Sequence, residues 1–377
     1  MTSRTFLFAG GGSGGHISPG LAIAERLIDR EPGSRVLFAC STRPIDARML
    51  AEAGVEHVAL PAMPLSLRPA GLARFLRSLR RSRVMCREAL ARHHVDHVIA
   101  LGGFVSAPAV LAARSQGVSA TLLNLDRPPG KANRWLARRC DRIWTAIELP
   151  TLPRFARRVV GMPIRRRALA PGDRRACRAR LSLDPDRPVL LVTGASQGAA
   201  SINRFMRAMA ESRADVFAGW QVLHLAGDAD VESIRREYEQ RGIPGRVEPF
   251  LDEMGLAWGS ADLAVSRAGA SSVAEVAANA VPTLFLPYPY HRDMHQVHNA
   301  RPLAETGGAM IVEDRIEARA NIADAGRALT ALLADETSRS TMRARLLERR
   351  PPDAAATIAD LLLEEERGDS RRTPRPG

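Results

Sequence analysis

The sequence is poor in lysine, aromatic residues and cysteine, and each shortage argues against a class of protein. Lys131 is the only lysine, so arginine carries the formal net charge of +13. A positive charge of this size suits phosphorylated ligands, nucleic acid or anionic lipid. Because only 5% of the residues are aromatic and they do not interleave with the basic ones, we expect no nucleic-acid partner whose bases stack on the protein.

The cysteines and the hydrophobic runs point to a cytosolic protein. No two cysteines form a C-x-x-C pair, so reduced thiols are expected. No apolar run reaches the roughly 18 residues of a membrane-spanning helix, and we expect no signal peptide before the first strand. A chain of 377 residues, 45% of them hydrophobic, predicts two domains with full cores. The cysteines are Cys40, Cys86, Cys140 and Cys177.

A glycine-rich turn between a strand and a helix dominates the start of the chain. Phe6–Ala9 predicts a buried strand, Gly10–Gly15 a turn, and the apolar spacing after Pro19 a helix. Backbone N–H groups and a helix N-terminus then meet at one point, which attracts phosphate or another negative charge. His16, directly behind the glycines, is either a base in that site or a side chain that only caps the helix.

This turn matches part of two nucleotide-binding motifs. Its glycines fit the G-x-G-x-x-G spacing of dinucleotide-binding proteins, but Cys40–Arg43, after the second predicted strand, contains no acid for an NAD ribose. A P-loop is excluded because no Lys-Ser or Lys-Thr follows the glycines. A dehydrogenase is therefore the least favoured hypothesis.

Strands and helices alternate along both halves of the chain, which predicts doubly wound parallel sheets of the α/β class. The Pro- and Arg-rich segment Leu149–Arg180 predicts a linker. We expect an N-terminal domain at 1–160 and a C-terminal domain at 161–350. Residues 351–377 are expected to hold the end of a helix, Thr341–Glu366, and a disordered tail. The predicted strands are Phe6–Ala9, Val36–Ala39, His57–Leu60, His97–Leu101, Ala120–Leu123, Arg142–Thr145, Val189–Val192, Gln221–Leu225, Arg246–Pro249, Leu263–Val265 and Thr283–Leu286.

The segment Leu67–Arg92 combines apolar residues at helical spacing with arginines in the gaps. One interpretation is an ordinary surface helix with a solvated arginine face. The other is a helix that lies on anionic lipid, where each basic side chain contributes about 1 kcal/mol. The sequence permits both.

Several groups of residues resemble metal ligands. His93–His97 lies where a helix meets a strand, and adjacent residues on a strand point apart. The acidic triplets Asp184–Asp186 and Asp228–Asp230 fall in predicted turns, and polar residues interleave with the histidines between His291 and His298. We expect no metal site in this chain.

The segment Ser266–Asn299 contains a further glycine turn between a strand and a helix. Ser271 and Ser272 are placed to bind phosphate oxygens, and Glu275 to accept hydrogen bonds from a ribose diol. The alternative is a capping box, in which the serines and Glu275 only complete the helix N-terminus.

Motifs from both halves together identify a family resemblance. They are GGGSGGHISPGLAIA, LGGFVSAP, GKANRWLA, TGASQGA, FLDEM, SRAGASSVAEV and HRDMHQVHNA. In this combination the chain, over roughly residues 4 to 345, resembles the MurG family, the lipid I N-acetylglucosaminyltransferases of peptidoglycan synthesis. The resemblance implies a GT-B fold, in which two Rossmann-like doubly wound domains face an interdomain cleft.

The resemblance also implies a reaction and its partners. N-acetylglucosamine is transferred with inversion from UDP-N-acetylglucosamine to the C4 hydroxyl of the N-acetylmuramyl residue of undecaprenyl-linked lipid I, which gives lipid II. No cofactor and no metal are implied. The protein is expected at the cytoplasmic face of the cell membrane as a peripheral protein, with Leu67–Arg92 as its contact to the anionic surface.

The resemblance assigns roles to individual residues. His16 is implied as the base or as a group that positions the acceptor, and Asp126 is expected as a second catalytic residue. Arg165 is implied to approach the nucleotide, Leu251 to read uracil, and Glu275 to hold the ribose. The other substrate-binding residues are Ser13, Gly14 and Gly15 near the phosphates, Asn124 and Asp126 near the acceptor, Ser196 and Gln197 in the second glycine turn, Ala270, Ser271, Ser272, Val273 and Ala274 around the diphosphate, and His295, Gln296 and Asn299 near the sugar.

The acceptor half departs from the family pattern. The usual His-Glu-Gln-Asn before the GKANRWLA motif reads Leu123 to Asp126 here, Phe104 stands in place of a tyrosine, and Met162 in place of an asparagine. Two alternatives therefore stay open. One is a UDP-sugar transferase with another lipid acceptor such as diacylglycerol, and the other is a UDP-sugar-binding scaffold without turnover.

Overall fold

The computed structural model describes residues 3–12, 14–66, 68–149, 151–155, 158–194, 198–290 and 294–369. The chain divides into two compact units. The first consists of Met1–Arg165 together with Pro352–Gly377, and the second of Arg166–Pro351. The division therefore falls a few residues beyond position 160, and the C-terminal segment belongs to the first unit.

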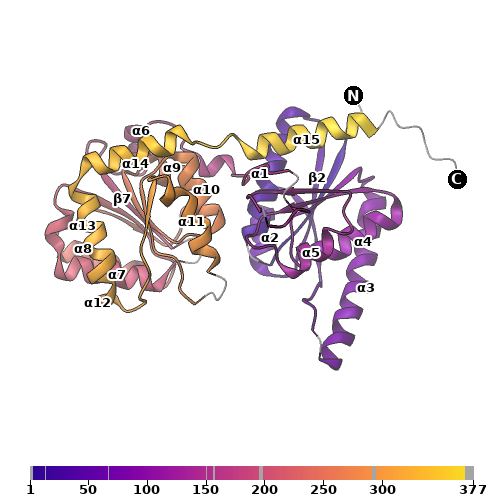
Figure 1. The fold of residues 1–377 in the computed structure, drawn as a ribbon, viewed down its shortest axis with the longest axis horizontal. Coiled ribbons are helices and arrows are strands. Elements are labelled where there is room, and N and C mark those ends of the chain that lie inside the picture. The colour runs from indigo at the N-terminus through magenta and orange to yellow at the C-terminus, as the bar shows by residue number, and fades with distance from the viewer. Residues whose placement is uncertain are drawn as a thin grey trace. The chain divides into compact units, whose positions relative to one another are not determined.

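The first unit is a six-stranded parallel sheet with the order β3-β2-β1-β4-β5-β6 and helices around it (Figure 1). This order is that of a doubly wound dinucleotide-binding fold. Its elements are β1 Thr5–Ala9, α1 Gly14–Arg30, β2 Arg35–Ser41, α2 Pro44–Glu52, β3 Glu56–Leu60, α3 Pro69–Arg92, β4 His97–Ala100, α4 Ser106–Gln116, β5 Ser119–Asn124, α5 Lys131–Leu136, β6 Arg142–Thr145 and α15 Ala354–Asp369.

The second unit repeats this arrangement with the order β12-β11-β10-β7-β8-β9, again parallel. The predicted α/β class and the two doubly wound sheets are confirmed. Its elements are a 3₁₀ turn at Arg166–Ala168, α6 Arg174–Arg180, β7 Val189–Thr193, α7 Ala200–Ser212, a 3₁₀ turn at Ala214–Phe217, β8 Gln221–Leu225, α8 Val231–Gln240, β9 Gly245–Glu248, α9 Met254–Ser260, β10 Leu263–Ser266, α10 Ala270–Asn279, β11 Thr283–Phe285, α11 His295–Glu305, β12 Ala309–Ile311, α12 Ala318–Asn321, a π-helical turn at Ile322–Gly326, α13 Arg327–Ala334 and α14 Glu336–Glu348.

The central strands β1, β4, β7 and β10 are buried along their whole length, as expected where helices cover both faces of a parallel sheet. Phe6 and Phe8 of β1 belong to one hydrophobic cluster, whereas Leu7 and Ala9 belong to the cluster on the opposite face. Side chains that alternate along a strand point to opposite faces, so a continuous apolar run fills two cores. This is why the apolar segments of the sequence located the strands so well.

Both sheets reverse their strand order at the same relative place, between β1 and β4 and between β7 and β10. Ligands of such sheets bind at the carboxyl ends of the strands next to this reversal. Described glycines of the motifs come directly after these strands: Gly10–Gly12 and Gly102–Gly103 in the first unit, and Gly194 and, three residues after β10, Gly269 in the second. The fold thus brings two such turns together in each unit.

Three local predictions differ from the structure. Helix α1 begins at Gly14, before Pro19, because a proline near a helix start removes only one main-chain hydrogen bond. The expected helix Thr341–Glu366 is wrong: α14 ends at Glu348 and α15 begins at Ala354, since Pro351 and Pro352 interrupt it. The three-residue strand β12 was not predicted, and its short, partly exposed segment carries little pattern.

The C-terminal helix α15 is part of the hydrophobic core of the first unit. Ile358 and Leu362 lie in the same buried cluster as Phe8 and Leu27. At the start of α15, Arg26 of α1 donates to Asp353 over 2.9 Å. The chain therefore returns to its first unit after completing the second. Within the described ranges, no helix is both long and apolar enough to cross a membrane.

We predict that Ile358→Ala lowers the free energy of unfolding of the first unit by about 2 to 4 kcal/mol, because it removes a fully buried side chain and leaves a cavity. Denaturant unfolding measures the loss. Thr357→Ala on the exposed side of the same helix is the control and should change stability by less than about 0.5 kcal/mol. Equal losses in the two variants would contradict the docking of α15 on the sheet.

Candidate active site

His16 lies between the two glycine turns of the first unit. It is in the first turn of α1, and a Cβ on Gly10 would lie 3.3 Å from the His16 Cβ and 2.9 Å from that of Leu101. A Cβ on Gly103 would lie 3.7 Å from Cε1 of the imidazole. His16 therefore packs against Gly10 at its Cβ and against Gly103 at its imidazole, and its side chain is 17% exposed. These contacts restrict the position of the His16 side chain, as a functional group requires.

Asp126, the other residue predicted to be catalytic, faces this imidazole, and its catalytic role stays a prediction. Its Oδ2 lies 4.0 Å from Nε2 of His16, and the Asp126 side chain is 49% exposed. A carboxylate at this distance stabilises a positive charge on the imidazole. Nδ1 of His16 is buried and has no hydrogen-bond partner among the described residues. The pair can accept a proton at Nε2 and stabilise the cation that results.

A buried amide network holds Asp126 in place. Asn124, at the end of β5, donates to the main-chain oxygen of Asp126 over 2.9 Å and accepts from Asn133 over 2.8 Å. Oδ1 of Asn133 in turn accepts from the Gly103 N–H over 3.2 Å. Asn124 and Asn133 are both almost fully buried. Asn124 therefore positions the loop that carries Asp126 and links it to the second glycine turn.

Sequence reasoning missed two residues of this arrangement. Asn133 lies inside the GKANRWLA motif, and that motif could have indicated it as a site residue. Asp46, in the first turn of α2, is fully buried, and its Oδ2 accepts from the Gly12 N–H over 2.7 Å and from the Ser41 hydroxyl over 2.5 Å. An acid thus follows the second strand, but it is buried against the glycine turn and cannot hold an NAD ribose.

Arg165 is placed against the first unit. Its Nε donates to Glu25 of α1 over 2.9 Å, and its side chain is 11% exposed. Nη1 of Arg165 is buried and makes no hydrogen bond to the described residues. The nucleotide contact expected for this arginine stays a prediction.

In the second unit, Glu275 points into the protein instead of capping its helix. Helix α10 begins at Ala270 after Gly269, and no side chain caps its N-terminus. The capping-box alternative for Ser271, Ser272 and Glu275 is therefore excluded. Glu275 accepts from the Trp258 indole N–H over 2.9 Å. Burial raises its pKa to about 7, against smaller opposing effects of the Trp258 hydrogen bond and the charge of Arg167.

The predicted sugar-binding residues of α11 are held close to α10. Asn299 donates to the main-chain oxygen of Ala268, just before α10, over 3.2 Å. Gln296 accepts from the Tyr288 N–H over 2.9 Å. Leu251 packs against the hydrophobic cluster that also contains Trp258. Asn299 thus ties α11 to the turn that precedes α10.

A buried ion pair behind these turns was not predicted. Arg267 donates over 2.7 Å to Asp314 and over 2.6 Å to the hydroxyl of Ser201, the second residue of α7. Burial raises the pKa of Asp314, but hydrogen bonds from Ser201, Asn321 and the Ile316 N–H, with the charge of Arg267, outweigh this and hold the pKa below its usual value. Arg267 therefore connects the segments that follow β7, β10 and β12.

The metal-like groups have other partners. Asp230 accepts from Asn203 over 2.7 Å, Asp186 pairs with Arg175, and His97 bonds to Thr121 over 2.9 Å. Across the described ranges, no three His, Cys, Asp or Glu side chains converge as a metal site would require. Of the predicted site residues, Ser13, Ser196 and Gln197 lie outside the described residues, as does His291.

Because the pKa of Glu275 is raised, we predict that the free energy of unfolding depends on pH. The folded-state pKa of about 7 exceeds the ordinary value of 4.5, so the folded protein holds this proton more tightly and loses stability as the pH rises from 4.5 through 7. Glu275→Gln keeps an acceptor for Trp258 without a charge. As the pH rises from 5 to 8, the free energy of unfolding of the variant relative to wild type should increase by about 2 kcal/mol. Denaturant unfolding at both pH values measures it. A pH-independent difference would contradict the raised pKa.

Comparisons with known proteins agree with this geometry. The chain matches the glycosyltransferase family 28 N-terminal domain over residues 6–145 and the glycosyltransferase family 28 C-terminal domain over residues 189–358. The crystal structure of Acinetobacter baumannii MurG superimposes with a TM-score of 0.73 at 25% identity, covering 96% of this chain and 100% of that chain.

Two curated relatives share one name, that of a UDP-N-acetylglucosamine--N-acetylmuramyl-(pentapeptide) pyrophosphoryl-undecaprenol N-acetylglucosamine transferase. The transferase of Nocardioides sp. is 37% identical over 97% of this chain and 99% of its own length. That of Clavibacter sepedonicus is 39% identical over 82% of this chain and 83% of its own length. The chain belongs to the family of UDP-N-acetylglucosamine--N-acetylmuramyl-(pentapeptide) pyrophosphoryl-undecaprenol N-acetylglucosamine transferases, the MurG family, and its two units have the GT-B type of fold.

Proposed function

We propose that this protein transfers N-acetylglucosamine from UDP-N-acetylglucosamine to lipid I, with His16 as the base. The placement of His16 between two glycine turns, with Asp126 4.0 Å from its Nε2, is the observation that carries this role. The names of the relatives favour lipid I as the acceptor over diacylglycerol. Retention of His16 and a facing carboxylate favours turnover over a scaffold that only binds the donor.

In the proposed reaction, the C4 hydroxyl of the acceptor sugar loses its proton to Nε2 of His16. The oxygen attacks the anomeric carbon of N-acetylglucosamine from the face opposite UDP, and the bond to the diphosphate oxygen breaks, so the configuration inverts. Asp126 stabilises the imidazolium that forms. Backbone N–H groups at the start of α10, together with Ser271 and Ser272, stabilise the negative charge of the leaving diphosphate.

We predict that His16→Ala lowers the rate of transfer to a lipid I analogue about a hundredfold or more, because general-base catalysis contributes about 10² to 10⁴ in rate. Radiolabelled N-acetylglucosamine follows the transfer. Affinity for UDP should not change, since the predicted UDP-binding side chains of α10 lie in the other unit. His57→Ala, on strand β3, is the control. Full activity of the His16 variant would exclude His16 as the base.

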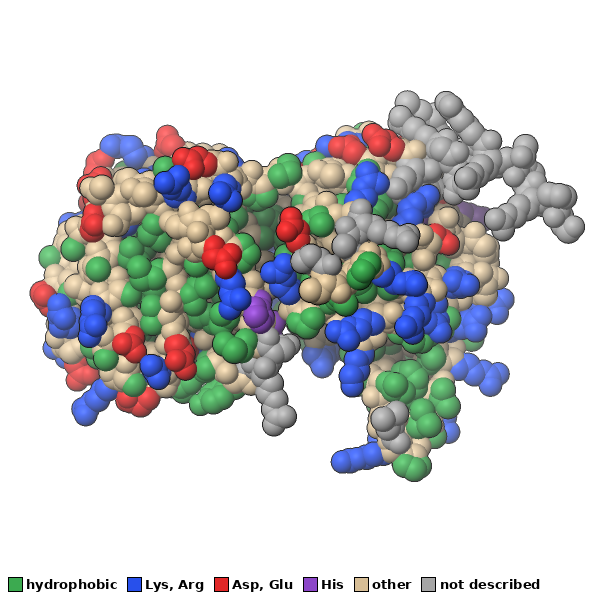
Figure 2. Space-filling model, in the orientation of Figure 1, with side chains coloured by type: hydrophobic (Ala, Val, Ile, Leu, Met, Phe, Trp, Pro, Cys, Tyr) green, Lys and Arg blue, Asp and Glu red, His purple; other side chains and the backbone are tan. Residues whose placement is uncertain are grey.

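We also propose that the first half of α3 contacts the anionic membrane surface. None of the residues from Pro69 to Arg81 is buried, and Figure 1 shows this part of the helix projecting from its unit. Leu76 is 55% exposed and Leu65, before the helix, 61%. Figure 2 shows hydrophobic and basic side chains together on this projection. Apolar side chains that enter the interface, beside arginines that attract lipid phosphates, fit a surface-bound helix.

We predict that Arg74, Arg77 and Arg80 changed together to Gln weaken binding to phosphatidylglycerol vesicles about a hundredfold at low salt, because each arginine near the surface contributes about 1 kcal/mol. Vesicle co-sedimentation measures the loss, and UDP affinity should stay the same. The control changes Arg204, Arg213 and Arg236, all exposed in the second unit, to Gln. The same weakening in both triple variants would refute a specific role of α3.

A further inference from the structure

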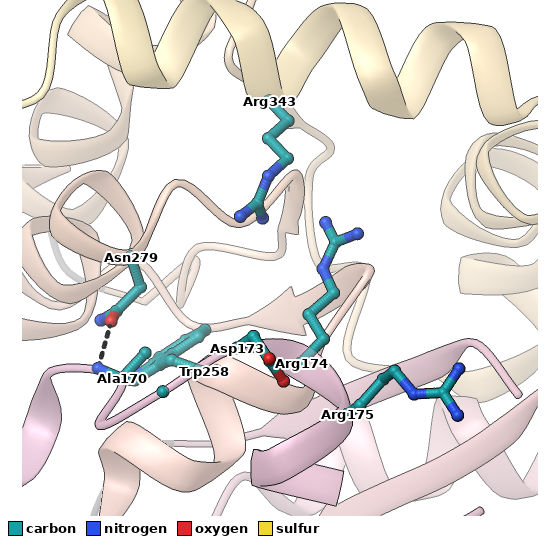
Figure 3. Close-up of a pocket in the computed structure, with 9 residues that line it drawn as sticks. Ala170, Asp173, Arg174, Arg175, Trp258, Asn279 and Arg343 are labelled. Atoms are coloured by element: carbon teal, nitrogen blue, oxygen red, sulfur yellow. Dashed lines mark hydrogen bonds between the residues drawn. The ribbon is translucent and has the colours of Figure 1, made fainter. Parts of the chain in front are cut away.

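The second unit contains a cavity that the proposed reaction does not use. Its volume is about 450 Å³, and all of its lining residues belong to the second unit. The walls come from the segment before and at the start of α6, from α9, from the end of α10, and from α14 (Figure 3). A cavity of this size holds a small metabolite.

Two guanidinium groups project into this cavity. Figure 3 shows Arg343 of α14 and Arg174 of α6 extending toward one another from opposite walls. Arg343 donates to the main-chain oxygen of Ala280 over 3.1 Å, and no described carboxylate lies within 4.0 Å of it. Because like charges repel, the arrangement is costly unless an anion lies between them.

The acids nearby do not neutralise this pair. Asp262 lies 3.2 Å from Arg174, but it also accepts from Arg178 over 2.5 Å and from the Val189 N–H over 2.8 Å. Asp173 accepts from the Ala176 N–H at the start of α6. Nε of Arg174 is buried without a partner among the described residues. Burial and then the charge of Arg174 lower the pKa of Arg343, and the charge of Asp262 opposes this only in part.

The cavity differs from the expected diphosphate site. It adjoins Asn279, the last residue of α10, whereas the diphosphate is expected at the first residues of that helix. Ten residues of helix separate these ends by about 15 Å. The cavity still shares a wall with the donor site, because Trp258 and Asn279 line it and both bond to Glu275.

We propose that this cavity is a second anion site, which binds a soluble phosphate-bearing compound between Arg174 and Arg343. Two guanidinium forks on opposite walls match the several oxygens and the double charge of a phosphate or diphosphate group.

The test is calorimetric titration of the full chain with inorganic pyrophosphate, while saturating UDP fills the donor site. Wild type should bind one pyrophosphate, and Arg343→Gln and Arg174→Gln should each weaken that binding about tenfold or more. Arg343→Lys should retain part of it. Arg236→Gln removes an exposed arginine of α8 and serves as the matched control. Thermal unfolding of each variant identifies any that fails to fold.

The outcomes separate this site from the transfer reaction. Unchanged pyrophosphate binding in both cavity variants, or equal weakening in the control, would overturn the proposal whether or not the protein transfers sugar. A further arm adds glycerol phosphate or phosphatidic acid vesicles to the pyrophosphate complex. Displacement by glycerol phosphate alone supports a soluble ligand. Displacement by the vesicles alone overturns the soluble assignment and identifies a lipid headgroup instead.

Discussion

The buried carboxylate of Asp46 fixes the first glycine turn, and the position of the candidate base depends on that turn. A glycine turn with free N–H groups is an anion site, but here the Gly12 N–H already donates to Asp46 over 2.7 Å. The Asp46 carboxylate therefore occupies the position in which such a turn would otherwise bind an anion. His16 packs against Gly10 of this turn on one side and against Gly103 of the neighbouring turn on the other.

The two units use the same strand order for different chemistry, because different side chains brace their turns. In the first unit an acid and two amides, Asp46, Asn124 and Asn133, hold the turns and leave a histidine and a carboxylate facing each other. In the second unit a buried arginine, Arg267, connects the turn segments through Ser201 and Asp314. The first unit thus presents the proposed base with a carboxylate facing it, and the second presents the start of α10, where we propose that the diphosphate binds.

The sequence located the sheets well because the central strands are buried on both faces and so appear as apolar runs between turn residues. It also indicated His16 with Asp126, which the structure brings to 4.0 Å. It could not indicate the contact of Asp46 with the glycine turn or the network of Arg267, because these partners lie far along the chain: Asp46 and Gly12 are 34 positions apart, and Arg267 and Ser201 are 66. The break between α14 and α15 has a local signal in Pro351 and Pro352. The docking of α15 on the first unit has none, because it follows from contacts with α1.

The departures from the family pattern in the acceptor half correspond to a different arrangement of polar contacts. The family's glutamate position is Asn124 here, and this side chain is fully buried between Asn133 and the main chain of Asp126. A glutamate there would bring a charge into a site whose hydrogen bonds an amide can satisfy without one. The negative charge lies instead at Asp126, which is half exposed and faces His16. A carboxylate at that position keeps part of its hydration, and it lies where the proposed mechanism needs a negative charge beside His16.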